Sequence, residues 1–185
     1  YTDDITLEHQ VRMHVVRSPY AHAELGAIDN AAAQSLPGVL AVLTAADVIA
    51  DGLGNLPCIY RVDNLDGSQN AYPPRPLLAQ GRVRYVGEPV AIIIAETVEA
   101  ARAGGDLIEI EYESLPCTTN TARTTDEGQP QIWDDAPNNV CYDYGVGDHA
   151  ATDAAFASAA HVVSLDLVNN RLVPNYMEPR AALAE

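Results

Sequence analysis

Lysine is absent from the sequence, and the ten basic residues, all arginine, are outnumbered by 26 acidic residues, which gives a formal charge of −16. A surface with this charge repels the phosphates of nucleic acids and the head groups of anionic lipids. We therefore expect no nucleic-acid partner and no attachment to a membrane. The exclusive use of arginine fits either a coding bias or a preference for planar, bidentate ion pairs, and it identifies no function.

Cysteine and long hydrophobic runs are also scarce. Cys58, Cys117 and Cys141 are odd in number and lack the Cys-x-x-Cys spacing of zinc and redox sites. No apolar run approaches the roughly 18 to 20 residues needed to span a bilayer, and the first residues show no signal-peptide pattern. These absences predict a soluble, cytoplasmic protein with reduced thiols. Both ends are abrupt, since the chain starts at Tyr1, so we expect a piece of a longer protein.

Hydrophobic periodicity predicts strands and helices that alternate along the chain. The expected strands cover residues 10–17, 39–43, 89–95, 107–112, 140–144 and 161–171. The expected helices cover residues 31–36, 45–49, 98–105 and 153–160, with N-caps at Thr44 and Thr97 and an end at Gly104-Gly105 for the third helix. The long loop 51–76 is of the kind that is often functional or interfacial, and a second loop-rich stretch covers residues 114–139. The irregular connections favour an α+β fold over a doubly wound sheet.

Residues 145–150, Gly-Val-Gly-Asp-His-Ala, match the Gly-x-Gly-x-x-Ala form of a dinucleotide-binding turn. Asp148 argues against that function, because it places negative charge where a pyrophosphate would meet the helix N-terminus. The preceding strand also contains Asp143 where an apolar residue is expected. An independent enzyme that binds a nucleotide here is therefore the weakest of three hypotheses.

No catalytic or metal-binding pattern stands out elsewhere. The five histidines lack the spacing that places two imidazoles on one metal ion, and no serine lies in a Gly-x-Ser-x-Gly elbow. Glu178 and Arg180 flank Pro179 and are expected to support a domain interface or a pocket, with structural ion pairing favoured over contact with substrate. We assign no catalytic, cofactor-binding or metal-binding residue from the sequence.

Several segments, taken in order, resemble the molybdenum hydroxylase family, which includes xanthine dehydrogenase, aldehyde oxidase and the large subunit of aerobic carbon monoxide dehydrogenase. The resemblance begins with Tyr-Thr-Asp-Asp-Ile at residues 1–5 and Arg-Ser-Pro-Tyr-Ala-His-Ala at residues 17–23. It continues at residues 36–39, 43–47, 86–91, 111–116, 169–171 and 177–181. Each motif is modest alone, but their order and spacing make the combination specific over nearly the whole chain. His9-Gln10 stands where the family usually has a proline-glycine turn.

The resemblance implies three parts for this chain. Residues 1–116 are expected to form an α/β hammerhead domain, residues 117–160 a connector with loop, strand and helix, and residues 161–185 the opening strands of a molybdopterin-binding domain. The family's catalytic motifs, such as its Gly-Gly-x-Phe-Gly segment, do not occur in this sequence. The resemblance therefore implies an amino-terminal structural fragment that is inactive alone.

The resemblance also implies the cofactors and partner subunits of the complete enzyme. In the complete large subunit it implies a molybdopterin cofactor with molybdenum, and on partner subunits it implies iron-sulfur and FAD groups, within an oligomer. The complete enzyme would carry out oxidative hydroxylation of an aldehyde, an N-heterocycle or carbon monoxide. The alternative is a standalone module that docks on subunits through its long acidic loops, without catalysis.

Overall fold

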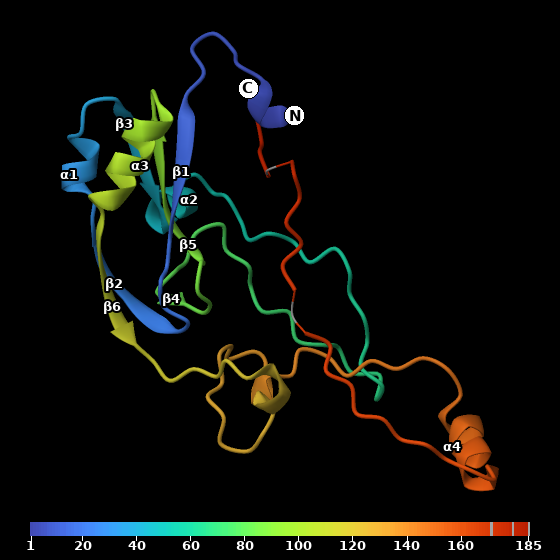
Figure 1. The fold of residues 1–185 in the computed structure, drawn as a ribbon. Helices are drawn as coiled ribbons and strands as arrows, with labels where there is room; N and C mark the ends of the chain where they lie inside the picture. Colours follow the sequence, from blue (N-terminus) through green and yellow to red (C-terminus); the bar gives the residue numbers. More distant parts are fainter. Residues whose placement is uncertain (171, 179, 185) are drawn as a thin grey trace. The chain divides into compact units, whose positions relative to one another are not determined.

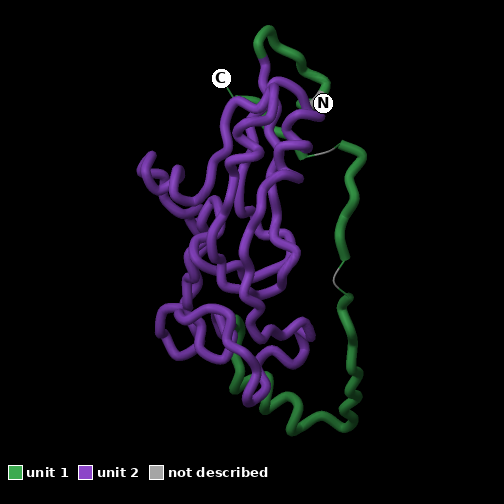
Figure 2. Tube along the Cα trace, turned by 90° about the vertical axis from the view of Figure 1, so that its left-hand side faces the viewer, with its two compact units in different colours: residues 1–9, 145–185 green, residues 10–144 purple. Residues whose placement is uncertain are grey.

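The chain divides into two compact units in the computed structural model, which describes residues 1–170, 172–178 and 180–184. The larger unit comprises residues 10–144, and the smaller unit comprises residues 1–9 and 145–185 (Figure 2). Among the described residues, both β-sheets lie in the larger unit (Figure 1). The smaller unit contains the 3-10 helix η1 (Thr2–Asp4) and the helix α4 (His149–Ser158).

The first sheet has the strand order β1-β5-β3, with antiparallel neighbours. Its strands are β1 (Arg12–Arg17), β5 (Pro89–Ala95) and β3 (Val39–Thr44). The helix α3 (Val98–Asp106) lies against β1 and β5, and α1 (Ala31–Gln34) lies against α3 and β3 (Figure 1). The core between these helices and the sheet consists of Ala33, Val42, Ile93, Ala95 and Ala101.

The second sheet has the strand order β4-β2-β6 and is also antiparallel. Its strands are β4 (Arg82–Val83), β2 (Ala23–Asp29) and β6 (Glu109–Ser114). A second core contains Ala23, Ala79, Val83 and Val90. Because Val90 and Ile93 of β5 belong to different cores, β5 is covered on both faces. This burial explains why β5 is an unbroken apolar run instead of an alternating one.

The predicted helix starts at Thr44 and Thr97 are confirmed. Thr44 and Asp47 form a capping box at α2 (Ala45–Ala50), and the Thr97 hydroxyl accepts a hydrogen bond from the Ala100 amide at 3.1 Å. These side chains satisfy amides that have no partner inside the helix.

The predicted end of α3 at Gly104-Gly105 is wrong, since the helix continues to Asp106. The glycines instead allow close approach to the sheet. A Cβ at Gly104 would lie 3.1 Å from Val39 Cγ2 and 3.2 Å from Ile93 Cγ2. Packing, and not helix termination, therefore accounts for glycine at position 104.

Three further predictions are corrected. Residues 140–144 and 161–170 form no strand, and Arg171 lies outside the described residues. A strand needs a neighbouring edge to pair with, and the alternating apolar pattern of residues 161–170 has none within the described chain. The helix α4 starts at residue 149 instead of 153, because Asp148 caps it. The sequence also fails to predict β2, whose apolar pattern is interrupted by Gly26.

Two more 3-10 helices, η2 (Thr121–Arg123) and η3 (Pro137–Asn139), lie in the loop that follows β6. No helix in the described part of the chain has the length and apolar character needed to cross a membrane.

Candidate functional site

Glu178 and Arg180 both lie in the smaller unit. They line an open, exposed hollow together with Tyr1, Thr2 and Tyr176. No ion pair joins the two side chains, and Pro179 between them lies outside the described residues. Their role at an interface or pocket therefore stays a prediction.

The turn at residues 145–150 is not arranged to receive a phosphate. A carboxylate oxygen of Asp148 accepts a hydrogen bond from the Ala151 amide at 2.9 Å, so this first-turn donor of α4 is already used. The strand expected before the turn does not form. Both findings disfavour a dinucleotide at this position.

Buried polar residues mark a different place in the larger unit. In the described part of the chain they are Ser18, His22 and Glu88, which are 2%, 6% and 4% exposed. All three belong to the segments 17–23 and 86–91 that carry the resemblance. The segments are joined because the Ser18 amide donates to the Glu88 carbonyl at 2.9 Å, and the Gly87 amide donates to the Ser18 carbonyl at 2.8 Å. Gly87 has φ of +91°, a conformation that favours glycine.

Glu88 and Arg84 form the charged part of this cluster. A carboxylate oxygen of Glu88 accepts the Arg84 amide at 2.5 Å. Burial raises the pKa of the Glu88 carboxyl and lowers the pKa of the Arg84 guanidinium, and the attraction between the two groups opposes both shifts. The guanidinium also lies 4.0 Å above the centre of the Trp133 ring. This contact fixes the loop after β6 to the sheet domain.

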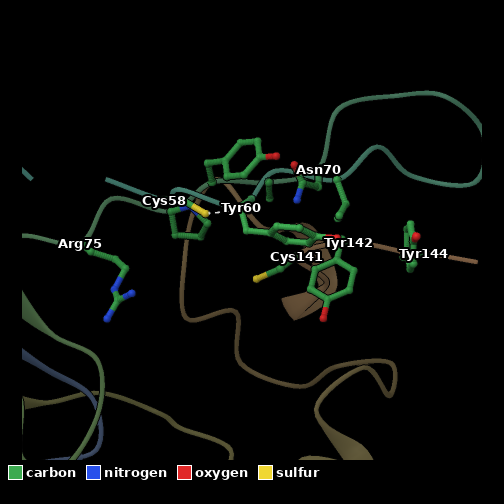
Figure 3. A pocket seen from close by; sticks show the side chains of 11 residues that line it. Cys58, Tyr60, Asn70, Arg75, Cys141, Tyr142 and Tyr144 are labelled. Carbon is green, nitrogen blue, oxygen red and sulfur yellow. Dashed lines mark hydrogen bonds between the residues drawn. The ribbon is translucent and has the colours of Figure 1, made fainter. Parts of the chain in front are cut away.

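A pocket of about 330 Å³, here called the tyrosine pocket, lies between the loop 51–76 and residues 140–144 (Figure 3). Its lining is mostly apolar and aromatic and consists of Cys58, Tyr60, Val62, Asn70, Ala71, Tyr72, Pro73, Arg75, Cys141, Tyr142 and Tyr144. The side-chain oxygen of Asn70 is buried and has no hydrogen-bond partner within the described chain.

Backbone hydrogen bonds hold the walls of the tyrosine pocket together. The Leu56 amide donates to the Arg75 carbonyl, and the Ala71 amide donates to the Cys141 carbonyl, both at 2.8 Å. The Arg61 guanidinium lies 4.6 Å above the centre of the Tyr72 ring. Three irregular segments therefore lie side by side without forming a regular sheet.

Sequence reasoning indicated these segments but missed the pocket residues. It named the loop 51–76 as functional or interfacial, and it did not single out Asn70 or any tyrosine in the loop. The available signal was composition, because the chain has nine tyrosines against one phenylalanine, and four of the nine line this pocket. A loop alone cannot reveal which residues meet the distant segment 140–144.

Comparisons with known proteins give two family matches, which are separated by residues 117–131. Residues 1–116 match the a/b hammerhead domain of aldehyde oxidase and xanthine dehydrogenase, and residues 132–185 match a molybdopterin cofactor-binding domain. The chain is 36% identical to the nicotine 6-hydroxylase large subunit of Paenarthrobacter nicotinovorans, with 100% of this chain and 22% of that protein covered. It is 31% identical to the carbon monoxide dehydrogenase large chain of Afipia carboxidovorans, with 96% and 22% covered.

A solved structure agrees with these matches. The carbon monoxide dehydrogenase of Oligotropha carboxidovorans superposes with a TM-score of 0.69 at 28% identity, over 87% of this chain and 20% of that one. The chain thus spans about a fifth of the length of the relatives that it matches.

The residues present do not form a cradle for the molybdopterin group that the second match implies. Every described residue from Val146 to Ala184 is exposed, so this part offers no buried polar side chain to hold such a group. Among the described side chains, no group of three or more His, Cys, Asp or Glu could hold a metal ion.

Proposed function

The chain belongs to the aldehyde oxidase and xanthine dehydrogenase family and is homologous to the amino-terminal part of its large subunits; we propose that it supports a molybdopterin-binding body without taking part in the chemistry. The complete subunit would carry out oxidative hydroxylation of an aldehyde, an N-heterocycle or carbon monoxide. The chain itself would supply a rigid platform and contact surfaces.

The observation that supports this proposal is that parts of the two matched regions are bonded to each other within the larger unit. Residues 71 and 141 come from different family matches, yet their backbones are hydrogen bonded. Arg84 and Trp133 add a second link between the same two regions. Such links would fix the start of the cofactor-binding region on the hammerhead, and positioning is what a protein contributes to a cofactor enzyme.

The proposal retains three parts: a hammerhead at residues 1–116, a connector at residues 117–160 and the start of the molybdopterin-binding domain at residues 161–185. The hammerhead match supports the first boundary. The second match begins at residue 132 and thus reaches into the connector. Glu178 and Arg180 would then face the remainder of the large subunit.

The partners in this proposal are iron-sulfur and flavin subunits in a cytoplasmic, oligomeric complex. The names of the relatives, large subunit and large chain, describe parts of assemblies. Cys58, Cys117 and Cys141 are free and exposed, which a reducing compartment tolerates.

Affinity purification of the tagged chain from its source cells tests the proposal. We expect the rest of the molybdopterin-binding domain to be recovered with it, on the same or on a separate polypeptide, together with iron-sulfur and flavin absorption in the visible spectrum. Recovery of the chain alone would contradict the proposal. Recovery with iron-sulfur and flavin subunits but without a molybdopterin-binding polypeptide would contradict it too, in favour of a standalone docking module.

A further inference from the structure

We propose that the tyrosine pocket docks a proline-rich segment of a partner protein, in the polyproline II conformation and with a basic residue next to the prolines. The pocket and the acidic hollow beside it lie within the larger unit. The inference therefore does not rest on the proposed function, which concerns the cofactor-binding region.

The rings of the tyrosine pocket are open to solvent. Tyr60, Tyr142 and Tyr144 are between 54% and 74% exposed. A small-molecule site usually encloses most of its ligand, which rings as exposed as these do not do. Exposed apolar groups that gather in one place are instead typical of a surface that a protein partner covers. The pocket therefore suits a chain segment that lies across the rings.

The hydroxyl groups of the pocket favour one conformation of that segment. Within the described chain, none of the four tyrosine hydroxyls in the pocket has a hydrogen-bond partner. A segment in the polyproline II conformation has no internal hydrogen bonds, so its carbonyls are free to accept from these hydroxyls while its proline rings pack on the aromatic faces.

The other two regular conformations fit the pocket less well. A helix uses its carbonyls internally, so a helix that covers the tyrosines would bury their hydroxyls without acceptors. A β-strand would need the edge of another strand to pair with, and the described walls of the pocket contain none.

The charge beside the pocket favours a basic residue in the partner. A second hollow shares Tyr142 with the tyrosine pocket and is lined by Asp66, Asp135 and Asp143. No ion pair in the described chain involves these carboxylates, and no arginine lines the hollow. An arginine or lysine next to the prolines would meet them there, and the formal charge of −16 attracts such a segment from a distance.

The two arginines near the tyrosines do not oppose this arrangement. Arg75 lines the pocket, and Figure 3 shows its guanidinium directed away from the labelled tyrosines. Arg61 lies over the ring of Tyr72 and leaves the other rings free. Neither arginine lines the acidic hollow. The prolines of the partner would therefore lie on the tyrosines and its basic residue at the aspartates.

Titration of the full chain with two synthetic peptides, followed by amide NMR shifts, tests this inference. The first is a capped peptide of one arginine followed by prolines, and the second has glutamate in place of the arginine. We expect the arginine peptide to bind saturably and, at low salt, about five- to tenfold more tightly, because the exchange replaces attraction to the aspartates by repulsion. The shifted amides should belong to residues 58–75 and 140–144. Shifts elsewhere, equal affinities, or no saturable binding would overturn the proposal.

The mirror image of the arginine peptide, built from D-amino acids, separates the polyproline II conformation from nonspecific binding. It has the same charge and apolar area but the opposite helical hand, so its carbonyls and proline rings cannot meet the tyrosines in the same arrangement. We expect this peptide to bind too weakly to saturate. Equal binding of the two mirror images would overturn the assigned conformation.

A helical peptide tests the other class of partner. An alanine- and leucine-rich peptide with one arginine presents apolar side chains and a positive charge, but its carbonyls are used within the helix. We expect it to bind more weakly than the arginine-proline peptide. Tighter binding of the helical peptide would assign the tyrosine pocket to a helix and overturn the proposal.

Variants test the two features that carry the argument. Tyr142→Phe keeps the ring and removes one hydroxyl, so it should weaken the arginine-proline peptide about fivefold, the loss of one hydrogen bond. Asp143→Asn should weaken the arginine-proline peptide but not the glutamate peptide. Tyr176→Phe, in the other unit, should change neither. The amide spectrum of each variant reports whether the fold is intact. Unchanged affinities in folded Tyr142→Phe and Asp143→Asn variants would overturn the assignment.

Discussion

At the scale of single residues, the buried carboxyl of Glu88 has the clearest consequence for the chain's behaviour. A carboxylate oxygen of its side chain accepts the Arg84 amide in the turn between β4 and β5, and burial raises its pKa above the ordinary value of 4.5. The folded state therefore holds this proton more tightly than the unfolded state. The resulting stabilisation is complete below the unfolded pKa and is lost as pH rises through the folded pKa.

Glu88→Gln should remove this pH-dependent step. Glutamine keeps an oxygen that can accept the Arg84 amide but has no proton to lose. We expect the free energy of unfolding, measured by urea denaturation from pH 4 upward, to fall more steeply with pH in the natural chain than in the variant. The other carboxyls titrate in both proteins and cancel in the comparison. Parallel curves would contradict the assigned burial of this carboxyl.

Asn139 holds the loop after β6 together through its side chain. Its oxygen accepts the Ile132 amide at 3.0 Å, and its nitrogen donates to the carbonyls of Thr124 and Pro130, both at 2.9 Å. Its φ of +59° is also one that asparagine tolerates better than most residues. Three hydrogen bonds and a special conformation thus depend on one side chain.

Asn139→Gly should loosen this loop by about 3 kcal/mol, because glycine keeps the conformation but loses three hydrogen bonds of about 1 kcal/mol each. Amide hydrogen exchange of residues 120–139 measures the local opening. Asn138→Gly is the matched control: Asn138 also has a positive φ, of +55°, but its side chain makes none of the three hydrogen bonds that hold the loop, so exchange should stay unchanged. Equal exchange rates in the two variants would refute the role of the Asn139 side chain.

At the scale of elements, α3 shows what a sequence pattern reveals and what it conceals. Thr97 correctly indicates the helix start, because capping depends on neighbours in sequence. Gly104 resembles a signal for the helix end, but the absence of a side chain there allows close contact with Val39 and Ile93. The first signal is local and could be predicted, and the second depends on strands distant in sequence and could not.

Gly104→Val should cost about 2 kcal/mol or more in unfolding free energy, since the added atoms have no space against the sheet. Ala103→Val on the exposed side of the same helix should cost less than about 1 kcal/mol, the difference in helix propensity alone. Thermal or urea denaturation of both variants measures the contrast. Similar losses in the two variants would show that α3 does not pack on the sheet through Gly104.

The strands show the same division between local and distant information. The central strand β5 could be predicted with its observed bounds. Burial on both faces requires apolar residues at successive positions, and the sequence shows this as an unbroken apolar run. Residues 161–170 carry a strand pattern as well, yet they remain unpaired in the described chain. Hydrophobic periodicity indicates that a segment is suited to form a strand. The strand forms only where the edge of another strand is available for pairing.

At the scale of the whole molecule, the resemblance of several ordered motifs identified the family, whereas the chemistry of individual residues indicated no function. Order and spacing of short motifs indicated the family that the comparisons then confirmed. The tyrosine pocket could not be predicted in this way, because loop 51–76 and residues 140–144 meet only in the folded chain. The many exposed apolar residues beyond residue 144, such as Val163 and Leu167, fit surfaces that require a neighbour.

Molybdenum content, measured on the purified chain alone and on the complex recovered from its source cells, tests the supporting role most directly. The account predicts stoichiometric molybdenum in the complex and none in the isolated chain, since the exposed residues after position 145 form no cradle. Retention of molybdenum cofactor by the isolated chain, or a native complex in which this chain is present and molybdenum is absent, would contradict the account.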